Sequence, residues 1–182
     1  MRRLWLGLLL CACSGSSDNS VDGTVQGASL SARDALYFVH GGKQLFVVSD
    51  QDDTCRKLTR QAVPGEIHLL EMYLWNATSS DPTALFEGTY EVADDGTTAL
   101  ESQAHFGVGT ECSLTTTRWF PASSGRVILI GAGLPQPGER SQIAFRLDFG
   151  GDLLTGHADA TYCPLPATGA IGCIREFVEP TP

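Results

Sequence analysis

The chain has 182 residues, of which 12 are basic and 21 are acidic, and its formal net charge at pH 7 is −9. This length is enough for one domain with a substantial core. The acidic balance argues against nucleic acid as a partner and against electrostatic docking on anionic lipid, because both need a basic surface. The same balance is compatible with solubility, with cations and with a basic partner.

The first residues have the layout of an export signal. Arg2 and Arg3 lead into an apolar run from Leu4 to Ala12. This run is too short for a helix that crosses the hydrocarbon core of a membrane, which needs about 20 residues. It suits the apolar region of a signal peptide. We therefore predict that residues 1–12 are a signal peptide that is removed on export.

The end of this run resembles the lipobox of bacterial lipoproteins. That family carries Leu three places before the cleavage point, a small residue just before it and an obligatory Cys just after it. Leu10, Ala12 and Cys13 occupy those places. The resemblance implies that Cys13 is diacylated and becomes the mature N-terminus, and two acyl chains make a stable anchor. Lipidation at Cys11, with bulky Leu10 beside the scissile bond, and ordinary secretory cleavage near Ala12 are the alternatives.

The residue after the lipidated cysteine bears on the final location. In some bacteria Asp at that place retains a lipoprotein in the inner membrane, whereas this chain has Ser14. The resemblance therefore implies a bacterial cell-envelope protein held in the outer membrane, on its periplasmic or surface face, rather than in the inner membrane. Its acyl chains make the membrane its first partner.

A polar segment separates the signal from the rest of the chain. Residues 14–20 include no apolar side chain, which is typical of a flexible linker. We predict a flexible tether over residues 13–22 and a single domain over residues 23–182.

Most of this domain has strand signals, namely alternating or continuous apolar runs bounded by Gly, Pro, Asn and Asp. Gly41 and Gly42 separate two such runs and predict a hairpin. The segment 99–108 is the predicted partner of the segment 88–92, which ends at the turn signal 94–96. The predicted strands cover residues 35–40, 44–49, 68–75, 88–92, 99–108, 125–134, 141–149 and 152–162.

Helix signals are scarce. Asp53 is predicted to cap a short helix over residues 54–62, with Cys55 and Leu58 pointing inward. The 20 glycines and 9 prolines supply turn signals at short intervals. The predicted fold is an all-β antiparallel β-sandwich with at most one short helix, and an open β-barrel is the alternative.

Three segments give the domain a resemblance to small β-rich lipoproteins of bacterial envelopes. They are strand–turn–strand motifs at residues 86–92, 124–129 and 149–160. The resemblance implies the fold and the address of the protein and carries no active site.

Four cysteines remain beyond the signal: Cys55, Cys112, Cys163 and Cys173. An even number in a protein bound for an oxidising compartment indicates disulfides. We predict a Cys163–Cys173 bridge, because prolines and glycines between these two favour a compact loop, and hence a Cys55–Cys112 bridge. The other two connectivities stay open. A four-cysteine zinc site is disfavoured because it needs close CxxC pairs.

Candidate chemical groups are few. Asp50, Asp52 and Asp53 form the densest acidic cluster and are weak candidates for a calcium site, although a solvated turn with a helix cap is the favoured interpretation. His157 and Asp159 would share one strand face, where a surface hydrogen bond is favoured over a metal or acid–base pair. No motif for a cofactor, a zinc protease or a serine nucleophile is present, so no cofactor is predicted.

Two further groups of residues leave alternatives open. Trp75, Trp119 and Phe120 adjoin polar loops and could bind sugars or peptides, although packing is the favoured role. A glycosidase needs two carboxylates about 5 to 9.5 Å apart, and the sequence does not give such separations. The candidate carboxylates are Glu66, Glu71, Glu87, Glu91, Glu101 and Glu111.

The sequence therefore predicts a lipid-anchored envelope protein, most simply a non-enzymatic structural or binding module with an envelope protein or glycan as its partner. One alternative is a ligand carrier or inhibitor with a barrel-like pocket. The other is a hydrolase whose carboxylates the sequence does not identify.

Overall fold

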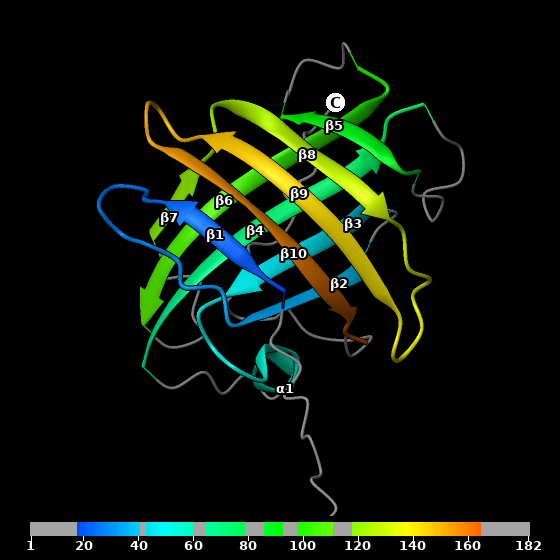
Figure 1. Cartoon of the computed structure of the whole chain (residues 1–182), viewed down its shortest axis with the longest axis horizontal. Coiled ribbons are helices and arrows are strands. Elements are labelled where there is room, and N and C mark those ends of the chain that lie inside the picture. The colour runs from blue at the N-terminus through cyan, green and yellow to red at the C-terminus, as the bar shows by residue number, and fades with distance from the viewer. Residues whose placement is uncertain are drawn as a thin grey trace, which may run out of the picture.

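The computed structural model describes residues 18–40, 43–59, 65–78, 86–92, 98–110 and 118–164. These residues form ten strands and one short helix (Figure 1). The elements are β1 (Ser20–Gly23), β2 (Asp34–His40), β3 (Lys43–Ser49), α1 (Thr54–Thr59), β4 (Glu66–Asn76), β5 (Gly88–Val92), β6 (Leu100–Thr110), β7 (Arg118–Pro121), β8 (Ser124–Gly131), β9 (Arg140–Asp148) and β10 (Leu153–Tyr162).

Eight of these strands close into a β-barrel. The hydrogen-bonded order is β2-β3-β4-β6-β5-β8-β9-β10, and β10 pairs with β2 to complete the ring. Two of the pairings, β2–β10 and β5–β6, are parallel and only two residue pairs long. The other six pairings of the ring are antiparallel. We call these two short parallel pairings the seams of the barrel.

The seams divide the ring into two antiparallel layers that cross each other in Figure 1. One layer contains β5, β8, β9 and β10, and the other contains β2, β3, β4 and β6. Along one edge of β10, the first half of the strand pairs with β1 and the last two residues pair with β2. Strand β7 pairs with β6, on the edge that also reaches β5. Each seam is therefore short because a second strand occupies most of the same edge.

The predicted sandwich is wrong, and the barrel alternative is confirmed, as a closed ring rather than an open one. The alternation of apolar side chains along each strand is the same in both architectures. What separates them is whether the outer strands of the two layers pair, and that pairing leaves no local pattern in the sequence. The predicted pairing of residues 88–92 with residues 99–108 is present only as the short parallel seam between β5 and β6. The antiparallel partner of β5 is β8.

The interior of the barrel is a packed apolar core. Strand β9 shows the underlying pattern, because Ile143, Phe145 and Leu147 are buried while the residues between them are not. Large aromatic side chains, among them Phe46 and Phe106, join the same cluster from the opposite layer. Strand β10 follows the same pattern, because Leu154, Ala158 and Ala160 are buried in this core.

A second apolar cluster lies on the outer face of β2, β3 and β4. Leu58 of α1 packs there against residues such as Phe38, Leu45 and Leu69. These three strands are therefore buried on both faces. The helix begins as predicted and has Leu58 fully buried, and the described part of it ends at Thr59.

A disulfide joins this helix to the end of β10. It links Cys55 to Cys163, across a sequence separation of 108 residues. Both predicted bridges, Cys55–Cys112 and Cys163–Cys173, are therefore wrong, while Cys112 and Cys173 themselves lie outside the described residues. Helix α1 packs against β2, and Cys163 at the end of β10 is hydrogen-bonded to β2, so two segments far apart in the sequence come together there.

The start of the domain also differs from the prediction. Residues 20–22, assigned to the tether, form most of β1 and pair with residues 155–157 of β10. The Ser20 hydroxyl lies 2.8 Å from His157 Nδ1, and Asn19 Oδ1 accepts a hydrogen bond of 2.9 Å from the Asp159 backbone N–H. The folded part of the chain thus begins closer to Cys13 than expected, and Cys13 itself lies outside the described residues.

Candidate functional site

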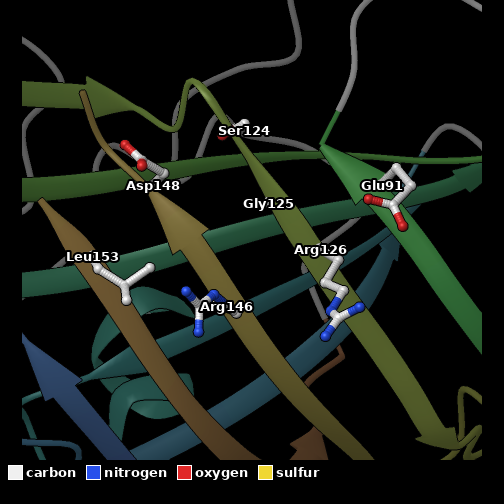
Figure 2. A pocket seen from close by; sticks show the side chains of 7 residues that line it. All are labelled: Glu91, Ser124, Gly125, Arg126, Arg146, Asp148 and Leu153. Atoms are coloured by element: carbon white, nitrogen blue, oxygen red, sulfur yellow. The ribbon is translucent and has the colours of Figure 1, made fainter. Parts of the chain in front are cut away.

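A groove of about 300 Å³ lies on the outer face of the layer formed by β5, β8, β9 and β10 (Figure 2). Its floor is made by strands whose inward residues belong to the barrel core, so the outward residues are free to be polar. The lining residues are Glu91, Ser124, Gly125, Arg126, Arg146, Asp148 and Leu153.

Two arginines stand directly opposite each other in this groove. Arg126 of β8 and Arg146 of β9 are register partners, and both side chains are exposed. Their strand neighbours Val127 and Phe145 are buried in the core, so alternation sends the arginines outward. Like charges opposite each other on neighbouring strands are destabilising. The fold therefore holds two positive charges together at a cost.

Neither arginine is neutralised by another residue of the described segments. Within the described residues, Arg126 and Arg146 donate no side-chain hydrogen bond and form no ion pair. Each guanidinium has five N–H donors in a planar fork that matches carboxylate and phosphate oxygens. The pair can therefore hold an anionic group between two adjacent strands of an otherwise acidic protein.

The backbone at the floor of the groove depends on Gly125. Its φ is +133°, a conformation that side-chain-bearing residues rarely adopt, and an added Cβ would lie 2.3 Å from the Arg146 carbonyl oxygen. A glycine here lets β8 approach β9 closely, which keeps the two arginines on adjacent, tightly paired segments.

Asp148 is tied to the turn that follows β9. Its Oδ1 accepts a hydrogen bond of 2.7 Å from the Gly151 backbone N–H. The Ser123 hydroxyl also lies 3.4 Å from the same oxygen. Across the register from Asp148, the half-exposed side chain of Leu153 adds apolar surface. This end of the groove is therefore fixed by the turn, and its carboxylate already has partners.

The row of charges continues beyond the groove across the second seam. Glu91 of β5 is the register partner of Arg126 on one side and of Glu101 of β6 on the other. Glu101 is 6% exposed, and its Oε1 has no hydrogen-bond partner. Trp75 of β4 stands opposite Glu101, with the Lys43 ammonium 4.7 Å from the centroid of its ring. Two arginines, two glutamates and an aromatic ring thus follow each other around the barrel.

The calcium candidates do not form a common site. Asp50 accepts a hydrogen bond of 3.1 Å from the His68 backbone N–H, and its other oxygen lies 3.3 Å from His68 Nδ1. Asp52 pairs with Arg33 at 3.5 Å, and Asp53 pairs with Arg56 at the start of α1. In the described part of the chain no three His, Cys, Asp or Glu residues are arranged to hold a metal ion.

His157 and Asp159 share a strand face as predicted but bind different partners. His157 contacts Ser20, as described above, and its Nε2 lies 3.7 Å from Asp18. Asp159 accepts a hydrogen bond of 2.7 Å from Arg140. The surface hydrogen-bond interpretation of these two residues is therefore the correct one.

Among the six candidate glutamates, strand register brings together Glu91 and Glu101. Glu71 is fully buried and accepts a hydrogen bond of 2.9 Å from the Tyr73 hydroxyl. Glu111 lies outside the described residues. Of the aromatic candidates, Trp75 and Trp119 are partly buried against the outer cluster, and Phe120 packs against the barrel core.

The sequence analysis missed Arg126 and Arg146. Each is the lone basic residue of its predicted strand, 125–134 or 141–149, and this was a usable signal. The sequence carried no signal that the two arginines lie opposite each other, because this depends on the register between β8 and β9.

No helix among the described residues is long and apolar enough to span a membrane. Comparison of the chain with protein-family models, with curated proteins and with solved structures gives no match.

Proposed function

We propose that the protein is a lipid-anchored, non-enzymatic binding module of the bacterial cell envelope, and that it binds an anionic group through Arg126 and Arg146. The observation that carries the binding role is the opposed pair of arginines in the groove, which has no carboxylate partner among the residues that the structure describes. Two surface arginines opposite each other are destabilising, and a protein can easily place them apart. We therefore expect such a pair where it serves binding.

Surface binding fits the barrel better than transport of a ligand inside it. An eight-stranded barrel has an interior just wide enough for side chains to fill or for one small ligand. Here twenty-two buried residues from the described segments form one core cluster, including Tyr37, Tyr90 and Phe106. The ligand-carrier alternative would need that space, so we favour the outer groove.

The groove also supports binding rather than catalysis. Its lining residues include no histidine or cysteine, and Asp148 is held by the turn. Ser124 stands opposite Asp148, but no histidine among the lining residues is available to activate its hydroxyl, as covalent catalysis by serine usually requires. The hydrolase alternative rests on the juxtaposition of Glu91 and Glu101 alone.

Binding of inorganic phosphate to the purified protein, measured by titration calorimetry, tests this role. Arg126→Gln and Arg146→Gln should each weaken binding by about tenfold or more, which corresponds to about 1.4 kcal/mol. The double variant should show no measurable binding. Neither change should lower thermal stability, because each removes a like-charge repulsion.

Arg118→Gln is the matched control, because Arg118 is an exposed arginine on β7 outside the groove. It should bind phosphate as the unmodified protein does. Absence of phosphate binding by the unmodified protein, or an equal loss in Arg118→Gln, would refute the proposed function.

The anchor is tested separately by replacing Cys13. Cys13→Ala should abolish metabolic labelling with fatty acid and release the protein from the membrane fraction, since lipidation needs that thiol. Cys11→Ala is the control and should keep both properties. Label and membrane association that survive in Cys13→Ala would show that the lipobox interpretation is wrong. The Cys55–Cys163 disulfide supports export in this proposal, because such bridges persist in oxidising compartments.

A further inference from the structure

We infer that the groove and the strand edge beside it select a zwitterionic ligand. A phosphate or carboxylate would bind Arg126 and Arg146, and a primary ammonium group would bind Glu91, which lines the groove, and Glu101, which lies beside it. This inference rests on the proposed function, because it adds a site for a positive group next to the proposed anion site. The row runs Arg146, Arg126, Glu91, Glu101, and each member is the register partner of the next.

The four charges leave one another unpaired. Glu91 and Arg126 are opposite each other on antiparallel strands, yet they form no ion pair in the described structure. Figure 2 shows the Arg126 guanidinium extending away from the Glu91 carboxylate. Two positive charges followed by two negative charges make a surface dipole, and a ligand of opposite polarity would satisfy both halves at once.

Glu101 supplies the independent observation. It lies on the outer side of β6, because its neighbours Leu100 and Ser102 belong to the inward face. The residue is more than nine-tenths buried, and its Oε1 has no hydrogen-bond partner in the described part of the chain. A buried carboxylate oxygen without a hydrogen bond is costly. Because Oε1 is closed to solvent, an ammonium group reaches it only when the Glu101 side chain turns towards Glu91. With three N–H donors, the ammonium group would then remove that cost and bridge Glu101 to Glu91.

The spacing limits the size of the ligand. Neighbouring strands lie about 4.7 to 4.9 Å apart, so the row from Arg146 to Glu101 covers three such steps, or about 14 Å. The innermost opposite charges, on Arg126 and Glu91, are one step apart. Aminoalkyl phosphates of two to six carbons reach from about one such step to about two, and phosphoethanolamine is the shortest of them.

The test compares each aminoalkyl phosphate with the alkyl phosphate of the same length, which lacks only the ammonium group. At one or more lengths the unmodified protein should bind the aminoalkyl phosphate at least fivefold more tightly. Glu101→Gln should abolish this preference and leave the affinity for the alkyl phosphate unchanged. Glu91→Gln should reduce the preference, and Glu87→Gln, an exposed glutamate outside the groove, is the control that should keep it.

Equal affinity for both members of the pair at every length would overturn the inference while leaving the anion site intact. A preference that survives in both Glu101→Gln and Glu91→Gln would overturn it as well. Failure of the proposed function is a different result, in which neither kind of phosphate binds.

A second experiment asks whether the zwitterionic ligand is a lipid headgroup or part of a soluble molecule, because the same chemical group occurs in both. Flotation of Cys13→Ala protein, which lacks the proposed anchor, uses vesicles of phosphatidylcholine with and without phosphatidylethanolamine. Flotation only with phosphatidylethanolamine assigns the ligand to a lipid headgroup. Binding of the soluble aminoalkyl phosphate without flotation assigns it to a soluble conjugate.

Discussion

Replacing Cys55 and Cys163 together with serine should lower the free energy of unfolding by about 4 to 5 kcal/mol. The bridge closes a segment of more than a hundred residues. In the chain-entropy account, a cross-link over that length removes much of the freedom of the unfolded chain, so its loss favours unfolding. For a domain of this size the midpoint of thermal unfolding should fall by roughly 8 to 20 °C.

The position of the bridge in the fold adds to this expectation. The Cys163 backbone N–H donates a hydrogen bond of 2.8 Å to the Tyr37 carbonyl oxygen, directly after the two residue pairs of the β2–β10 seam. The disulfide therefore holds the end of β10 where the barrel closes. Without it, this seam has only its short parallel ladder and the side chains around it.

Urea unfolding at pH 7 measures the effect, with Cys55→Ala/Cys163→Ala as the matched control. Alanine keeps an apolar group at the buried Cys163 position, so equal losses in the two double variants assign the effect to the cross-link. A loss below about 1 kcal/mol in the serine variant would contradict the prediction. Non-reducing peptide mapping should also recover a cross-linked peptide pair containing Cys55 and Cys163.

The sequence predicted the local elements well because strand signals are local. The predicted strands 68–75, 88–92 and 141–149 match β4, β5 and β9 to within about two residues at each end. In β9 and β10 the apolar residues at every second position share one face, and in both strands that face is the buried one. These patterns follow from burial of one face of a strand, which is written into every second residue.

Long-range pairing could not be predicted in the same way, and the candidate site depends on it. The β8–β9 pairing contains a register shift between Leu129 and Gly131. Without that bulge, counting from the β8–β9 connection would place Arg126 opposite Leu147 instead of Arg146. A shift by one residue reverses the face of every side chain relative to its partner, and no residue pattern fixes the place of a bulge.

The two seams have a common feature that strand patterns alone did not indicate. Each has a fully buried tyrosine whose hydroxyl donates to a carbonyl outside the strands. Tyr37, beside the β2–β10 seam, donates a hydrogen bond of 2.6 Å to Leu134 O. Tyr90, beside the β5–β6 seam, donates one of 2.7 Å to Phe86 O. The barrel thus closes at both places around a phenol that must stay protonated.

Alkaline solution should therefore destabilise the barrel through these two tyrosines. Burial raises the pKa of Tyr37 above its ordinary value of 10.0, and the negative charge of Glu139 raises it further. Burial likewise raises the pKa of Tyr90. Below pH 10 both residues are protonated in the folded and unfolded states, so their contribution is fully present. As the pH rises from 10 through the folded-state pKa values, the unfolded chain loses these protons first, and stability falls.

The slope of this loss cannot exceed about 1.4 kcal/mol per pH unit for each tyrosine, the value for one proton held by the folded state and absent from the unfolded one. The variant Tyr37→Phe/Tyr90→Phe should be less stable at pH 8, by about 1 kcal/mol for each lost hydrogen bond. Between pH 10 and 11 it should lose less stability than the unmodified protein, because phenylalanine does not titrate. The free energies of unfolding of the two proteins, measured with urea at pH 10 and at pH 11, should therefore converge as the pH rises. A gap that stays constant or widens would mean that ionisation of these seam tyrosines does not limit the stability of the barrel.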